Sequence, residues 1–325
     1  MRLEQSIWRA AAAAHHKRIT RLLRGCEIGD SHPIYNFLFT YLRADPSTLG
    51  RWSPGPSVLL EGGMSRSHEP HVWRGRGMTR LGDDCCYPVS AARPGRKATW
   101  KRTASLLRRI AGRSPNFQCY GLHEWAMLFR PEGAAAPNKF QESLPLRVSQ
   151  EQLNHIVMSL RPRCTHFDAF RFFAPDAVGL NTHRPQPSRH NADELTQPGC
   201  VHATLDLLRY ALALFPHLPA EVVGDALEIA VDARLIDMRA SPYDLSAAPE
   251  AARVDFDLSP ICIETREGRR EYQAAQADLA RRAAPVRSSL LRCYDEALQL
   301  QAELDVSSVD HHLGGAVPGV VVPLI

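Results

Sequence analysis

Three short stretches of the sequence place a histidine and a carboxylate among large apolar residues. The pairs are His123 with Glu124, His166 with Asp168, and His202 with Asp206. A histidine beside a carboxylate can bind a metal ion, orient its partner or move protons. Each pair alone is equally compatible with a structural hydrogen bond or ion pair inside a core. Three such pairs in one chain favour a shared site.

The third pair has a spacing with a defined geometry. Residues four apart lie on the same face of a helix, so His202 and Asp206 would face the same way, with Arg209 one turn further. The sequence "LIDMRASPYD" (235 to 244) places Asp237 and Asp244 on either side of Arg239. Because a guanidinium forks onto carboxylate or phosphate, this helix end could hold an anionic substrate. A helix end with a local salt bridge is the alternative.

The stretch "HFDAFRFF" (166 to 173) mixes ionisable and aromatic residues. If it is a strand, alternation places His166, Asp168, Phe170 and Phe172 on one face and Arg171 on the other. Aromatic rings raise the pKa of a neighbouring carboxylate by desolvation, and they can stack on a flat base or ring. A core that contains one buried ion pair explains the same residues.

Helical periodicity predicts the elements that would position these groups. The predicted helices cover 5–24, 32–43, 98–112, 150–160, 200–215, 220–238 and 268–304, the last broken at Pro285. Ser149 and Gln152 fit a capping box at the start of one of them. Residues 44–96 are rich in Pro, Gly, Ser and Arg, which predicts a long loop that buries little apolar surface, with one short strand at 58–60.

We therefore expect a mainly α protein: a single large helical domain with a few short strands and a long irregular N-terminal insert. The expected parts are N-terminal helices that pack on the main domain (1–43), a Pro/Gly/Arg-rich insert (44–96), a helical catalytic core (97–305) and a C-terminal tail (306–325). A chain of 325 residues can bury a core of this kind without a metal or disulfide staple.

Composition limits the location and the partners. Apolar residues make up 44% and charged residues 23% of the chain, as in an ordinary water-soluble protein, and no window approaches about 20 uninterrupted apolar residues, so no membrane span is expected. Eight cysteines without a C-x-x-C pair predict reduced thiols, and the N-terminus is a poor secretory signal; both favour the cytoplasm. Two basic helices, 15–24 and 97–113, could contact DNA phosphates or could be solvated faces.

Several common catalytic signatures are missing from the sequence. It contains no G-x-x-x-x-G-K-[ST], no G-x-G-x-x-G after a strand, no H-E-x-x-H and no G-x-S-x-G. Phosphate-loop, dinucleotide-binding, zincin and α/β-hydrolase functions therefore receive no support.

A set of longer runs resembles a known family. The runs are "HPIYNFLFTYLR", "RWSPG", "GLHEWAMLFR", "HFDAFRFF", "QPGCVHATLDLLRYA", "DMRASPYD" and "IET". Over roughly residues 30–290 the chain resembles a bacterial family, common in actinobacteria, that is labelled 3-methyladenine DNA glycosylase. The resemblance implies hydrolysis of the N-glycosidic bond of a modified base in DNA, with no cofactor.

Such an enzyme needs aromatic rings for the flipped base and a carboxylate to support the sugar cation or position water. The residues that could serve are Glu124, Asp168 or Asp237 as the carboxylate, His123, His166 and His202 as tuning or orienting groups, and Trp125, Phe167, Phe170, Phe172, Arg171, Arg239 and Asp244 as substrate contacts. The helix-hairpin-helix signature of many glycosylases is missing, because "LPAEVVGDALEIA" (218 to 230) has Ala220 at the first hairpin glycine and Gly224 too late for the second.

Two other functions stay open. The first is a metal-dependent oxidase or oxygenase that acts on a small molecule, with iron or manganese held by side chains from several helices. Its predicted ligands are His123, Glu124, His166, Asp168, His202 and Asp206. Convergence of these residues within about 5 Å of a common point would favour it, whereas carboxylates in an aromatic slot under a basic surface would favour base excision. The second is a non-enzymatic nucleic-acid-binding protein. No protein partner is predicted.

Overall fold

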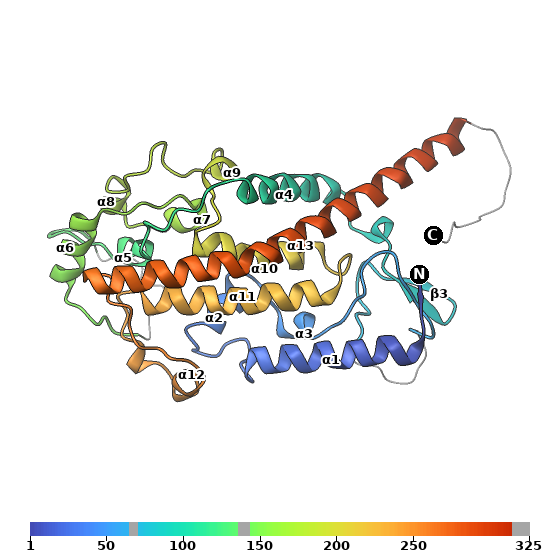
Figure 1. Ribbon diagram of the computed structural model, residues 1–325, viewed down its shortest axis with the longest axis horizontal. Coiled ribbons are helices and arrows are strands. Elements are labelled where there is room, and N and C mark those ends of the chain that lie inside the picture. The colour runs from blue at the N-terminus through green and yellow to red at the C-terminus, as the bar shows by residue number, and fades with distance from the viewer. Residues whose placement is uncertain (65–70, 136–143, 314–325) are drawn as a thin grey trace.

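The centre of the molecule is a group of long helices that lie side by side (Figure 1). The computed structural model describes residues 1–64, 71–135 and 144–313. In it, α10 (Val201–Leu214), α11 (Ala220–Arg239) and α13 (Arg266–Leu313) pack against one another. On the outside, α1 (Gln5–Leu23) contacts α11, and α4 (Arg96–Ala111) contacts α13. The prediction of a mainly α fold is confirmed.

The pattern of burial explains this arrangement. Helix α4 buries residues three or four apart, including Trp100, Leu107 and Ile110, and exposes Lys101 and Arg102 between them, so it covers the core with one face. Helix α11 is buried around most of its circumference, and the small side chains of Ala226 and Ala230 let its neighbours approach closely. It is therefore the central helix of the group.

The predicted break at Pro285 is wrong, because α13 is one continuous helix through that residue. Pro285 lies on the exposed side of α13, whereas Ala283, Val286 and Leu290 on the other side are buried. Proline removes only one hydrogen bond from the helix, and the packing of the buried side on both sides of it outweighs that loss. The C-terminal end of α13 extends beyond the rest of the protein (Figure 1).

Residues 44–96 contain more structure than the sequence suggested. They include α3 (Pro46–Leu49), β2 (Leu59–Leu60), β3 (Thr79–Leu81), β4 (Asp84–Cys86) and the short 3-10 helix η1 (Val89–Ala91). The N-terminal strand β1 (Arg2–Leu3) pairs in parallel with β2, and β2 and β3 pair antiparallel with β4, giving the order β1-β2-β4-β3. The strand predicted at 58–60 is confirmed, with β3 and β4 in addition.

This segment also has its own hydrophobic cluster. Trp8 of α1 is buried against Trp52, Leu60, Val72 and Tyr87. The expectation that residues 44–96 bury little apolar surface is therefore wrong. Widely spaced aromatic and aliphatic residues in a Pro- and Gly-rich segment give no periodicity, so their common partner Trp8 could not be recognised.

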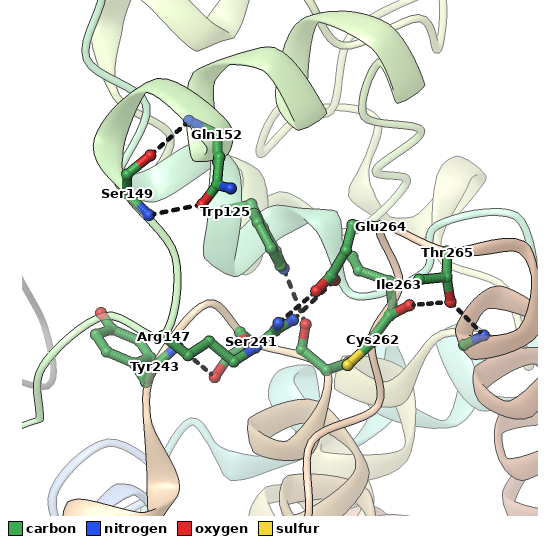
Figure 2. A network of polar contacts seen from close by, with 12 residues as sticks. Trp125, Arg147, Ser149, Gln152, Ser241, Tyr243, Cys262, Ile263, Glu264 and Thr265 are labelled. Carbon is green, nitrogen blue, oxygen red and sulfur yellow. Dashed lines mark hydrogen bonds and ion pairs between the residues drawn. The ribbon is translucent and has the colours of Figure 1, made fainter.

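Short helices surround one end of the long ones. They are α2 (Tyr35–Thr40), α5 (Leu122–Met127), α6 (Gln150–Leu160), α7 (Phe167–Phe170), α8 (Pro175–Val178), α9 (Ala192–Leu195), the 3-10 helix η2 (Leu245–Ala247) and α12 (Glu250–Asp255). The predicted capping box is present, since Ser149 and Gln152 each bond the other's backbone N–H (Figure 2). The strand considered at 166–173 is wrong: Phe170 and Arg171 donate their N–H groups to the carbonyls of His166 and Phe167, which makes a helical turn.

Two further observations bear on the sequence analysis. All eight cysteines are free thiols, and four of them are buried. Within the described ranges, none of the helices combines the length and the apolar content that a membrane crossing requires. The predicted C-terminal tail, 306–325, lies largely outside the described residues.

Candidate functional site

Helices α5, α10 and α11 bring His123, His202 and Asp237 together. All three side chains are buried, and one ligand atom from each lies within 4.8 Å of the other two. Among the described residues this is the one group of three or more such side chains with a geometry suited to a metal ion. Residues separated by more than 100 positions in the chain therefore form a single buried cluster.

The position of His123 depends on the residue that precedes α5. Gly121 has a φ of +70°, and a Cβ at this position would lie 3.1 Å from the Cβ of Ala240 at the end of α11. Glycine adopts this conformation without strain and leaves the room that the close approach needs. The start of α5 therefore lies directly against the end of α11, which carries Asp237.

The contact between His123 and Asp237 is unusual in its alignment. His123 Nε2 and Asp237 Oδ1 are 2.9 Å apart, but neither atom has a hydrogen-bond partner of acceptable geometry. The other oxygen, Asp237 Oδ2, accepts a hydrogen bond of 2.5 Å from Arg234 Nη1, which also donates to Glu124 Oε1 at 2.8 Å. One oxygen of Asp237 is thus held by Arg234, while the other lies against His123 Nε2.

Arg234 is the cation of a buried ion triad. It is 2% exposed and lies between two carboxylates, while its guanidinium stacks over the ring of Phe37 at 4.3 Å. A buried charge is tolerated only when partners of opposite charge replace the lost hydration. Arg234 therefore neutralises part of the negative charge of Glu124 and Asp237.

The protonation of the two histidines differs. Burial lowers the pKa of His123, but the negative charge of Asp237 and contact with that carboxylate outweigh burial, so the pKa is raised. The pKa of His202 is well below its usual range, first because the ring is buried and second because His123 adds positive charge nearby. His202 is therefore neutral near pH 7, which is the form of imidazole that binds metal ions.

A second histidine and carboxylate pair lies next to His202. His166 Nε2 contacts Asp206 Oδ2 at 3.0 Å, and Arg209 contacts Asp206 Oδ1 at 2.7 Å. Burial opposes ionisation of Asp206, but its bond to His166 and the charge of Arg209 prevail, so its pKa is lowered. The His202 ring stacks on His166 with centroids 5.4 Å apart and meets the edge of His123 at 4.5 Å. His202 therefore links the two pairs.

A cavity of about 170 Å³ gives access to this cluster, and we call it the inner cavity. Of the three clustered residues His202 lines it, together with Glu124, Arg234 and Asp168. Its other lining residues are Asn36, Phe37, Thr40, Tyr41, Met127 and Phe172. Charged groups that can do chemistry and aromatic rings that can hold an apolar or planar molecule thus line one space.

A second, smaller cavity lies against the same histidines. It measures about 20 Å³ and is lined by His123, His202 and the thiols of Cys119, Cys164 and Cys200, among others. A space of this size holds about one water molecule. The His123 and His202 rings therefore have room for a small ligand here, and His202 also lines the inner cavity.

The predicted metal ligands are only partly brought together. Of the six, His123 and His202 belong to the buried group, and Asp237, predicted as a catalytic carboxylate, completes it. Glu124 is bonded to Arg234, and Asp168 to Arg171 and Arg209 at 3.2 and 2.9 Å. His166 and Asp206 bond each other. The six predicted residues are therefore not brought to one point, and His123, His202 and Asp237 are the three that lie together.

The predicted substrate contacts also divide. Phe172 lines the inner cavity. Phe167 and Arg171 line a separate pocket next to it, which we call the outer pocket. Trp125 is 0% exposed and donates to the carbonyl of Ala240 at 2.9 Å, and Phe170 packs in the same core. Both rings are committed to the core, which argues against stacking on a substrate.

The proposed substrate corner at 235–244 is not formed. Arg239 donates to the carbonyl of Ser259 and contacts Glu271, and Asp244 accepts from the N–H of Ser246 at the start of η2. Neither residue lines either the inner cavity or the outer pocket. Asp237 points instead toward His123 and Arg234. Arg239 forms its ion pairs with Asp257 and Glu271, outside this stretch, and Asp244 bonds Ser246.

Six lining residues of the inner cavity were not anticipated from the sequence, among them Phe37, Tyr41 and Arg234. Phe37 and Tyr41 follow a helical pattern in "HPIYNFLFTYLR" that indicates core, and Arg234 is one of seven charged residues in α11. An arginine at a position where its neighbours are buried was the one available signal, because such a residue needs carboxylate partners.

A polar network around Arg147 contacts Trp125 of α5 (Figure 2). Arg147 Nη2 contacts Glu264 Oε2 at 2.9 Å, the second pair of atoms is also bonded, and Arg147 Nε donates to the carbonyl of Ser241. The guanidinium lies over the Trp125 ring at 5.2 Å. The network joins α5 to the segments that follow α11 and precede α13, which agrees with a structural role for Glu264.

Several basic residues of the two predicted DNA-binding helices form ion pairs with neighbouring helices. Arg18 of α1 contacts Asp225 and Glu228 of α11, while Lys97 and Arg108 of α4 contact Asp305 and Asp295 of α13. These ion pairs join neighbouring helices, so these arginines and lysines are not placed for phosphates alone.

Comparison of the chain with protein-family models, with curated proteins and with solved structures gives no match. The resemblance to the glycosylase family stays a prediction, and the function has to be argued from the site.

Proposed function

We propose that the protein is a metal-dependent enzyme in which His123, His202 and Asp237 bind one iron or manganese ion at the end of the inner cavity. One observation carries the proposal: ligand atoms of two histidines and one carboxylate, all buried, lie within 4.8 Å of one another. Two histidines and one carboxylate bind ferrous iron in many oxygenases, and they leave other coordination positions open.

The surroundings of the three ligands support a metal ion. A ligating carboxylate is normally held by a further hydrogen bond, and Arg234 provides it on Asp237 Oδ2. His123 Nε2 and Asp237 Oδ1 are close without hydrogen-bond alignment, which suits two atoms directed at one cation. Such an ion would supply oxidation of a small molecule by dioxygen, and Glu124 on the cavity wall would serve as proton acceptor.

Metal binding tests the proposal. Manganese(II) is titrated into metal-free protein, and unbound ion is followed by its electron paramagnetic resonance signal. We expect one ion per chain, and at least tenfold weaker binding for His202→Gln and for Asp237→Asn. Asp168→Asn is the matched control, because Asp168 lines the inner cavity without belonging to the ligand group. Equal binding by all four proteins, or none by the wild type, would contradict the proposal.

Catalysis has its own assay. Iron(II)-loaded protein is given candidate small molecules, and oxygen uptake is recorded with an electrode. We expect substrate-dependent uptake that His202→Gln abolishes, because the variant lacks one of the metal ligands. Uptake that is the same in the two proteins would show that it does not arise at this site.

Base excision is a second candidate, favoured by the lining of the inner cavity. Phe37, Tyr41 and Phe172 provide aromatic surface, and Glu124 and Asp168 provide carboxylates, in the same space. Together with the family resemblance, this lining suits a flipped base. If this candidate is correct, metal-free protein releases methylated base from alkylated DNA and Glu124→Gln loses that activity. Metal-free wild type that releases no base eliminates it.

A further inference from the structure

An arginine-rich pocket lies beside the inner cavity. Its volume is about 610 Å³, and its lining contains Arg43, Arg171, Arg189 and Arg209 against the single carboxylate of Asp168. This is the outer pocket described above. The excess of positive charge makes this space attractive to an anion, most of all to one that carries two negative charges.

The outer pocket and the inner cavity adjoin. Thr40, Tyr41 and Asp168 line both spaces. A molecule bound with one end among the arginines can therefore place its other end against Glu124 and His202. The outer pocket is much the larger and more open of the two, so it is the natural entrance.

The four arginines are held in different ways. Arg171 and Arg209 share Asp168, and Arg171 also donates to the hydroxyl of Tyr41 at 3.1 Å. Arg189 lies over the ring of Phe167 at 5.7 Å. Arg43 and Arg189 are exposed and, within the described part of the chain, form no ion pair with a carboxylate. Those two guanidinium groups are thus available to a ligand.

We infer that the outer pocket binds the phosphate group of a small-molecule substrate whose remainder extends into the inner cavity. A guanidinium presents parallel N–H donors that match phosphate oxygens, and arginine is favoured wherever phosphate is recognised in this way. The inference rests on the proposed function in one respect: it takes the inner cavity as the place where the substrate reacts.

The test measures binding to metal-free protein, so that its result is independent of the proposed metal. Inorganic phosphate and phenyl phosphate are titrated by calorimetry into the wild type, Arg43→Asn and Arg189→Gln. Asparagine is chosen at position 43 because Arg43 has a φ of +56°, which asparagine tolerates. We expect one site, tighter binding of phenyl phosphate, and roughly tenfold weaker binding of both probes in each variant.

Arg161→Asn is the matched control. Arg161 is also an exposed arginine with positive φ, +52°, and it lines neither the inner cavity nor the outer pocket. Its variant should bind both probes like the wild type. No phosphate binding, or an equal loss in the control, would overturn the inference.

A third probe separates a small molecule from nucleic acid. A short single-stranded oligonucleotide without a terminal phosphate offers only backbone phosphates. If it binds and loses affinity in Arg43→Asn and Arg189→Gln while phenyl phosphate does not bind, the pocket serves nucleic acid and the inference is wrong. Binding of phenyl phosphate but not of the oligonucleotide supports it.

Discussion

At the scale of single residues, the site depends on how buried charges are paired. Arg234 holds Glu124 and Asp237, and the remaining oxygen of Asp237 faces His123. The neutral His202 ring lies beside the charged pair rather than in it, because burial and the charge of His123 both lower its pKa. The cluster therefore combines a neutral imidazole, an imidazole that would release its proton to solvent when a metal ion binds, and a carboxylate in a fixed position.

Removal of Arg234 should lower the free energy of unfolding more than removal of an exposed arginine does. In Arg234→Met, Glu124 and Asp237 stay buried without their cation, and we expect the free energy of unfolding in urea to fall by about 3 to 5 kcal/mol. Arg282→Met is the control, since Arg282 pairs with Asp232 and Asp278 at the surface and its loss should cost less than about 1 kcal/mol. Equal losses in the two variants would show that Glu124 and Asp237 do not depend on the charge of Arg234 for the stability of the fold.

The Arg147 and Glu264 pair should make stability depend on pH. Burial raises the pKa of Glu264, but the bond to Arg147 outweighs it and the pKa lies below the ordinary 4.5. A lowered carboxylate pKa contributes stability that is present above 4.5 and lost as the pH falls through the lowered value. We expect Glu264→Gln to lose about 2 kcal/mol at neutral pH and to approach the wild type near pH 3, as measured by urea unfolding. A loss that is constant with pH would contradict this.

At the scale of elements, the long helices with periodic apolar residues could be predicted from the sequence. The short helices that carry the site could not. The helices at 5–23, 150–160, 201–214 and 220–239 follow from apolar spacing and, for α6, from the capping box of Ser149 and Gln152. The site is different, because α5 and α7 are short helices of six and four residues. Their positions depend on Gly121 and on the backbone bond that the carbonyl of His166 accepts. Such short elements are fixed by tertiary contacts, which the sequence does not display.

Helix α13 offers a direct test of how packing overrides local preference. Proline inside a helix costs up to about 3 kcal/mol, and Pro285 lies on the exposed side of α13. We therefore expect Pro285→Ala to stabilise the protein by about 1 to 3 kcal/mol and to raise its melting temperature. A melting temperature that is unchanged or lower would mean that the proline ring makes a contact worth more than the missing hydrogen bond.

At the scale of the whole molecule, the histidine and carboxylate residues named from the sequence do come close, but in two pairs joined by His202 rather than as one set of six. The sequence could indicate the residue types, since ionisable groups in apolar stretches are rare. It could not indicate that Asp237, predicted as a catalytic carboxylate, lies with His123 and His202, because that depends on the packing of α5 against the end of α11. The same packing leaves the inner cavity between α2, α5, α10 and α11.

The most direct test of this account is a crystal structure of the protein soaked in manganese(II), with anomalous diffraction recorded to locate the ion. We expect an anomalous peak roughly 2.2 Å from His123 Nε2, from Asp237 Oδ1 and from one ring nitrogen of His202. A peak bound elsewhere, or an empty position between these three side chains at saturating manganese(II), would contradict the central claim that they form a metal site.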